Sequence, residues 1–119
     1  MNSVNISEKL DKITAYWKPV IVGELNGQHV KLVKCKGEFV FHKHENEDEL
    51  FFVLEGEFDI EYRDRKEKVG IGEFIIIPRG IEHKPVARTE THLMVFEPAG
   101  TLNTGNKTNE FTVPDPQRI

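Results

Sequence analysis

Residues 41–49 read FHKHENEDE, and this stretch decides how the rest of the chain is interpreted. His42 and His44 are two positions apart, so on an extended strand both side chains point to the same side, about 6.6 Å apart along the strand. That spacing lets two imidazoles lean onto one metal ion. The acidic residues that follow suit a turn, and the apolar run 50–54 then returns as a strand that brings Glu49 beside the histidines.

A third histidine lies farther along the chain, after the tight connection Pro78-Arg79-Gly80. This connection ends one apolar run and starts the next, so His83 can bring a third imidazole to the same place. Each piece also has an ordinary interpretation. A His-Lys-His triplet is typical of a solvated strand end, and a lone Glu49 or His83 is typical of a surface or capping residue. Only the joint spacing favours a metal site.

Between Pro19 and Pro98 the sequence consists of short runs of β-branched and aromatic residues separated by turn residues. Asn26-Gly27, between two such runs, is the strongest hairpin signal. The expected strands are residues 20–25, 29–36, 39–44, 50–54, 58–62, 74–77, 83–87 and 91–97. Many short strands at even spacing predict an all-β sandwich or barrel.

The two ends of the chain have a different composition. Residues 7–16 carry the only helical pattern, with Ser7 as a cap and Pro19 closing the segment. After Pro98 the chain is rich in Thr, Asn, Gly and Lys and lacks the apolar density of a core element. We therefore expect an N-terminal helical segment (1–18), a β-barrel (19–98) and a C-terminal tail (99–119).

Size and charge narrow the possible partners. A chain of 119 residues with 38% hydrophobic residues can bury one core but not two. The net charge is −4 and no basic stripe is present, which argues against a nucleic-acid partner. No run is long enough to cross a bilayer and no secretory signal is visible, so the sequence predicts a cytoplasmic protein without a membrane partner. The lone Cys35 leaves histidine and carboxylate as metal ligands.

The joint spacing of the site residues closely resembles the two sequence motifs of the cupin family. The matching patterns are Gly37-x4-His42-x-His44-x4-Glu49-x6-Gly56 and Gly72-x5-Pro78-x-Gly80-x2-His83. There are two departures: four residues instead of five follow Gly37, and Ala87 stands where the family motif has asparagine. The resemblance implies a double-stranded β-helix, or jelly-roll barrel, with His42, His44, Glu49 and His83 as ligands of one metal ion.

Three neutral imidazoles and one carboxylate suit Fe, Mn, Ni, Cu or Zn as a divalent ion better than Ca(II). Octahedral coordination would leave two positions open for water or substrate. We expect a metalloenzyme acting on a small polar molecule, with isomerase-like or dioxygenase-like chemistry. The alternative is a metal-dependent ligand-binding or sensor module without turnover. The sequence does not identify the substrate, and it assigns no catalytic acid or base.

Strand alternation also predicts which side chains line the barrel. If Glu49 faces inward, so do Phe51 and Val53, and the run 58–62 has apolar residues inward and charged residues outward. Glu38 shares the parity of His42 and is expected to be solvated at the rim. The remaining histidines and the cysteine are expected to have structural or surface roles: His29, His92 and Cys35.

The same alternation places large apolar residues on the outside of the barrel. Leu50, Phe52 and Leu54 face outward, and the run 74–77 is apolar on both faces. Leaving such side chains in water costs about 1.5–3 kcal/mol each. The N-terminal segment is too short to cover them all. A homodimer paired through the outer sheet face is therefore predicted.

Overall fold

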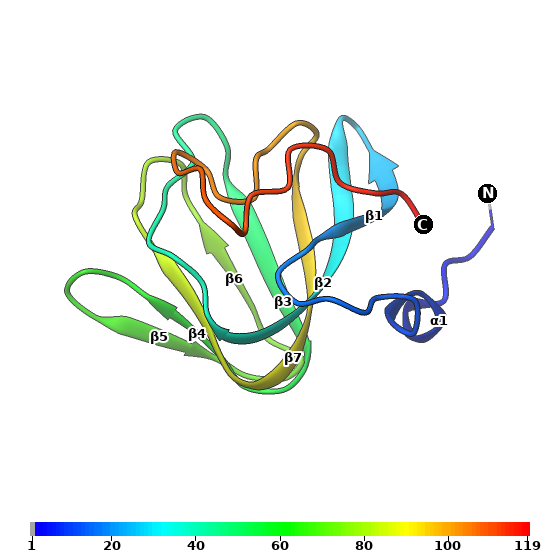
Figure 1. Ribbon diagram of the computed structural model, residues 1–119, viewed down its shortest axis with the longest axis horizontal. Coiled ribbons are helices and arrows are strands. Elements are labelled where there is room, and N and C mark those ends of the chain that lie inside the picture. The colour runs from blue at the N-terminus through cyan, green and yellow to red at the C-terminus, as the bar shows by residue number, and fades with distance from the viewer. Residues whose placement is uncertain (1) are drawn as a thin grey trace.

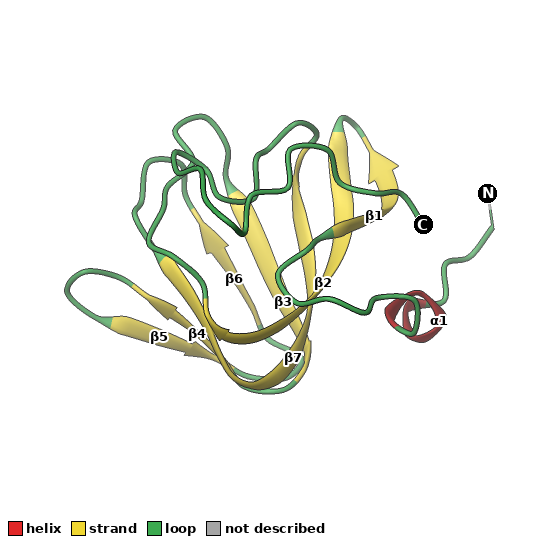
Figure 2. Cartoon of the chain, in the orientation of Figure 1, coloured by secondary structure: helices red, strands yellow, loops and turns green. Residues whose placement is uncertain are grey.

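The computed structural model describes residues 2–119, and its regular secondary structure is a set of antiparallel strands and one short helix, joined by loops (Figure 2). The elements, in chain order, are α1 (Ile6–Leu10), β1 (Val20–Leu25), β2 (Gln28–Glu38), β3 (Glu49–Glu55), β4 (Phe58–Glu61), β5 (Lys66–Val69), β6 (Phe74–Ile77) and β7 (Lys84–Pro98). Within residues 2–119 there is no helix with the length and hydrophobicity needed to cross a membrane.

The strands form one curled sheet in the order β1-β2-β7-β3-β6. On one side, β7 pairs with β2 along nearly its whole length. On the other side, the first part of β7 pairs with β4, whose other neighbour is β5, and the second part pairs with β3. Because β7 bends between these partners, the sheet wraps round into an open barrel (Figure 1). This is the predicted all-β jelly-roll fold.

The hairpin between β1 and β2 forms as predicted. Asn26 and Gly27 have φ angles of 49° and 76°. Positive φ at both central residues is the requirement of a type I′ turn, whose twist matches that of the two strands it joins. The Asn-Gly dipeptide therefore sets the register of the first two strands.

Three of the strand predictions need correction. Residues 83–87 and 91–97 belong to one strand, β7, because the exposed polar residues 88–90 continue the strand although they resemble a turn. The strand β5 was not predicted, since three of its four residues are charged and exposed. Residues 39–44 do not form a strand and have only an isolated bridge at His42.

The helix is also shorter than the predicted 7–16. It begins at Ile6 and is capped by Asn5, whose Oδ1 accepts a hydrogen bond from the backbone N–H of Glu8, rather than by Ser7. Trp17 leaves the helical path with φ 61°, and its backbone N–H and its indole N–H both bond to carbonyls of β2. Docking onto the sheet thus overrides local helix propensity, which is weak in so short a segment.

The core lies inside the barrel and agrees with the predicted parity. Phe51 and Val53 are buried, as are Phe58 and Ile60 of β4. Asp59 is an exception to the predicted charged outer face, because it is 2% exposed. Arg88 covers it and donates a hydrogen bond of 2.6 Å to its carboxylate.

Residues 99–119 run across the open end of the barrel as a packed segment (orange to red in Figure 1). Phe111 lies against Phe39, with 5.1 Å between the ring centroids, and joins the hydrophobic core. The backbone N–H of Asn106 donates to the Lys43 carbonyl, and the Lys43 N–H donates to the Asn106 side chain. The terminal Ile119 bonds to β1. This segment is therefore part of the barrel wall near the predicted site.

Candidate metal centre

The cupin-like motifs meet because the loop carrying the first two histidines pairs with the turn before β7. His42 and His83 exchange two backbone hydrogen bonds, of 3.0 and 2.9 Å. The Gly80 N–H donates to the His44 carbonyl at 2.7 Å. Glu49 is the first residue of β3. His42 and His44 are thus placed by pairing with a distant segment, and not by the predicted strand 39–44.

The structure brings the four predicted residues together. His42, His44, Glu49 and His83 are all buried, and each offers one ligand atom within 4.8 Å of the others. The Oε1 of Glu49 lies 3.4 Å from His44 Nε2 and 3.5 Å from His83 Nε2. One ion placed between these atoms would contact all four side chains.

Backbone carbonyls select the tautomer of two of the histidines. The Val40 carbonyl lies 2.9 Å from His42 Nδ1, and the Ile81 carbonyl lies 2.9 Å from His83 Nδ1. Because a carbonyl can only accept, each Nδ1 carries the hydrogen, and each Nε2 keeps a free lone pair. Such a bond also fixes the ring orientation of a metal-binding histidine.

Three buried polar atoms of the cluster lack hydrogen-bond partners, as expected of a site that binds a cation. His44 Nε2, His83 Nε2 and Glu49 Oε1 are buried and have no hydrogen-bond partner. Leaving a buried polar atom without a partner costs about 1–3 kcal/mol, so three in contact need an explanation. A divalent transition metal satisfies all three, and three imidazoles with one carboxylate are a donor set that such ions prefer.

The charge states of the free site also favour cation binding. Burial, with the nearby His83, lowers the pKa of His42 to about 4, so this imidazole is neutral at pH 7. Burial acts against protonation of His44 too, but Glu49 outweighs it and raises the pKa of His44. Burial would raise the pKa of Glu49, yet the adjacent side chains of Glu97, His44 and His83 lower it well below its ordinary value. The carboxylate is therefore anionic, which favours a cation at this place.

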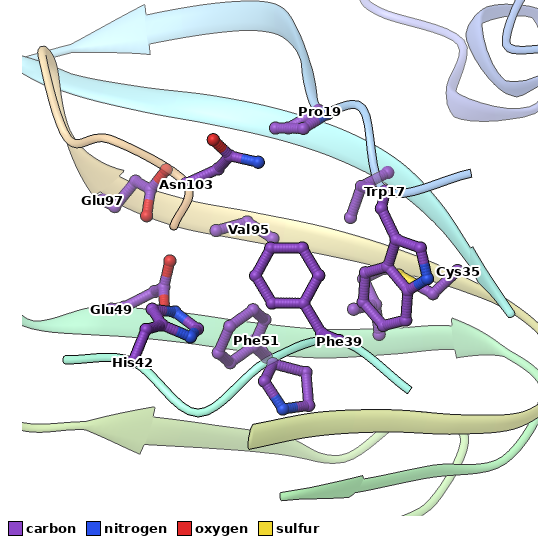
Figure 3. A pocket seen from close by; sticks show the side chains of 13 residues that line it. Trp17, Pro19, Cys35, Phe39, His42, Glu49, Phe51, Val95, Glu97 and Asn103 are labelled. Atoms are coloured by element: carbon purple, nitrogen blue, oxygen red, sulfur yellow. The ribbon is translucent and has the colours of Figure 1, made fainter. Parts of the chain in front are cut away.

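A cavity of about 50 Å³ inside the barrel adjoins the cluster (Figure 3). Its polar end is formed by His42, Glu49, Glu97 and Asn103. The rest of the wall is mainly apolar and comes from Trp17, Val33, Phe39, Phe51, Leu93 and Val95, with Pro19, Cys35 and Pro85. A small molecule held here would face the metal-binding cluster with one end and apolar side chains with the other.

Sequence reasoning missed three polar residues beside the cluster. Glu97 shares the inward parity of Leu93 and Val95, but the apolar residues on both faces of β7 concealed this signal. Lys31 donates a 2.7 Å hydrogen bond to Glu97 although it lies in an apolar run, and Asn103 comes from the supposed tail. Burial and the adjacent Glu49 carboxylate raise the pKa of Glu97 well above its ordinary value.

The two other histidines and Glu38 lie away from the four clustered side chains, as expected. His29 contacts Glu24 at 2.8 Å, and His92 contacts Glu90 at 2.9 Å. Glu38 is exposed and pairs with Lys84 at the surface. Cys35 is buried in β2, and burial raises its thiol pKa well above the ordinary value, which makes the thiol unreactive.

Comparison with known proteins gives the family. Residues 29–98 match the cupin domain model. YdbB of Bacillus subtilis is 38% identical over 64 residues, which are 53% of this chain and 57% of that protein, so the match spans little more than half of YdbB. A cupin-2 domain protein of Shewanella frigidimarina is 41% identical, with a TM-score of 0.78, over 80% of this chain and 93% of that one. Protein NMB1881 of Neisseria meningitidis is 26% identical, with a TM-score of 0.75, over 82% of this chain and all of that one. The chain belongs to the cupin family.

Proposed function

We propose that this cupin binds one divalent transition-metal ion through His42, His44, Glu49 and His83, and that the ion acts on a small molecule held in the adjoining cavity. The observation that carries the proposal is the convergence of buried donor atoms without hydrogen-bond partners. Their desolvation is costly unless a cation is bound. The donor set suits Fe, Mn, Ni, Cu or Zn.

The bound ion would act as a Lewis acid on a carbonyl or hydroxyl of the substrate, as isomerase-like or dioxygenase-like reactions require. The protein residues supply the remaining functions. The Val40 and Ile81 carbonyls hold two imidazoles in the ligating tautomer. The apolar wall excludes water and takes the body of the ligand, while Glu97 and Asn103 can bond to its polar end. Glu97 is also a carboxyl group within the cavity that can exchange a proton with a substrate.

The test combines metal analysis with turnover. Elemental analysis of the purified protein is expected to give about one transition-metal ion per chain. The loaded protein is then incubated with diketones, flavonoid-like phenols and phosphorylated sugars, with oxygen uptake and product formation recorded. Oxygen uptake would indicate a dioxygenase, and isomerised sugar an isomerase. Ligand-induced stabilisation without consumption would instead support the binding or sensor module.

We also propose that the protein works as a homodimer in the cytoplasm. The supporting surface is the outer face of β3, β6 and β7, where Phe74 is 59% and Ile76 is 54% exposed. Phe52 lies between Phe74 and Met94, and Leu50 lies between Ile76 and Phe96, so the apolar face is continuous. A second copy related by a two-fold axis is the simplest cover for it.

A further inference from the structure

Residues 102–113, which we call the C-terminal loop, lie directly on the candidate metal centre. A Cβ added to Gly105 would lie 3.2 Å from Cδ2 of the His42 imidazole, so the backbone passes close to this ring. Farther along the loop, Phe111 packs on Phe39, a residue of the cavity wall, with 5.1 Å between the ring centroids. The C-terminal loop therefore covers one side of both the metal centre and its cavity.

The site as it stands is too small for the ligands that the proposed function requires. The four clustered side chains are at most 4% exposed. The cavity beside them, which Asn103 of the C-terminal loop helps to line, has a volume of about 50 Å³ (Figure 3). One buried water needs about 10–15 Å³, and a cavity that binds benzene measures about 150 Å³. A sugar or a phenol can therefore enter only if part of the wall moves.

Few hydrogen bonds join the C-terminal loop to the rest of the protein. Within residues 2–119, the hydrogen bonds that link the loop to other parts of the chain are the two between Asn106 and Lys43, of 3.1 and 3.0 Å. A surface groove of about 200 Å³ lies at the same seam, lined by residues 43–47 and by residues of the loop. Parting this seam breaks two hydrogen bonds and no strand pairing.

Hydrogen bonds within the C-terminal loop let it move as one body. The Asn103 amide donates to the Phe111 carbonyl and accepts from the Val113 N–H, each at 2.8 Å. The Thr104 and Thr112 hydroxyls share a hydrogen bond of 2.8 Å. The segments before and after the loop are bonded to the β1–β2 turn and to β1. A compact loop of this kind, packed by its own side chains, can lift while its ends stay attached.

We propose that the C-terminal loop is a lid, which lifts along the seam between Asn106 and Lys43 to admit a ligand and then closes over it. Closure returns Asn103 to the cavity wall and keeps water away from the metal centre, where electrostatic interactions become stronger. The presence of a metal ion under the lid rests on the function proposed above, but the movement of the loop does not.

Cys35 reports the opening without any metal. It lines the cavity and is 0% exposed, so iodoacetamide in solution can alkylate it only when the wall opens. The alkylation rate of the metal-free protein is measured by mass spectrometry over a series of urea concentrations. Lifting of a lid exposes little surface, so alkylation through the lid is nearly independent of urea, whereas alkylation through global unfolding accelerates steeply.

Two variants distinguish the lid from the rest of the wall. Asn106→Ala removes the hydrogen bond that the Lys43 N–H donates at the seam. Tyr16→Phe is the matched control, because it removes the 2.7 Å hydrogen bond to Glu90 from the N-terminal segment, which borders the cavity through Trp17. The rates of Co(II) uptake and release, followed by the visible spectrum, are measured for the same proteins.

Without urea, we expect Asn106→Ala to raise the alkylation rate about three- to tenfold, which corresponds to one hydrogen bond, and Tyr16→Phe to leave it unchanged. Co(II) uptake and release should accelerate by the same factor at unchanged affinity, because a lid gates both directions equally.

A wild-type alkylation rate that follows global unfolding at every urea concentration would overturn the lid, and so would an Asn106→Ala rate equal to that of the wild type. Equal acceleration by Tyr16→Phe would overturn the assignment to this loop. A wild-type protein that binds no Co(II) would refute the proposed function, while the alkylation of the metal-free protein would still decide the role of the loop.

Discussion

At the scale of single residues, we expect the histidines of the cluster to be needed for metal binding and the other two histidines not to be needed. His42→Ala or His83→Ala removes one of only four ligands, so metal affinity should fall by more than about 100-fold. His29→Ala and His92→Ala are matched controls, because these imidazoles lie outside the cluster. Elemental analysis after dialysis measures the effect. Retention of one ion per chain in both ligand variants would sink the assignment.

The site should also lose metal as the pH falls, since a protonated imidazole cannot ligate. The pKa of His44 is raised, so protons begin to compete with the metal above the ordinary histidine value of 6.5. His42 adds no competition until the pH approaches its pKa of about 4. Metal titrations between pH 8 and 5 should show affinity decreasing steadily toward the acid side. An affinity independent of pH in this range would contradict histidine ligation.

At the scale of elements, the C-terminal segment is expected to depend on Gly105. A Cβ at this position would lie 2.2 Å from the Lys43 carbonyl oxygen, and φ is +57°. Gly105→Ala must therefore push the segment away from the loop of the first two histidines, at a cost of about 2–4 kcal/mol. Gly100→Ala is the control, because its φ of +89° is also positive but nothing lies within 4 Å.

Thermal denaturation of the two glycine variants measures the difference. Gly100→Ala carries only the backbone strain, about 1–2 kcal/mol, and should unfold at a higher temperature than Gly105→Ala. Limited proteolysis should cut residues 99–119 faster in the Gly105 variant. Equal melting temperatures would show that the close contact with Lys43 does not hold this segment.

At the scale of the whole molecule, the apolar face of β3, β6 and β7 predicts a dimer at micromolar concentration. Ile76→Asp puts a charge among the exposed apolar side chains of this face and should give a monomer. Leu25→Asp is the matched control, because Leu25 is similarly exposed (49%) but belongs to β1, at the other end of the strand order. Analytical ultracentrifugation over a concentration series measures the oligomeric state of the wild type and of both variants. A wild-type monomer would refute the dimer.

The sequence by itself determined the fold class, the first hairpin, the bounds of β1 and β6, and the four residues that meet in the barrel. The first three features depend on local rules, namely alternation along a strand and positive φ at Asn26-Gly27. The four site residues were predicted from the resemblance of their spacing to the cupin motifs. Local patterns carry such information because neighbours in the chain are also neighbours in space.

Only the tertiary structure decided how those residues are held. Residues 39–44 are placed by the bridge between His42 and His83, and β7 is a single strand because three different partners pair with it. The charges of Lys31 and Glu97 are buried side by side although 66 positions separate them. No periodicity along one segment reports a partner so distant, because such a pair exists only once the sheet has closed.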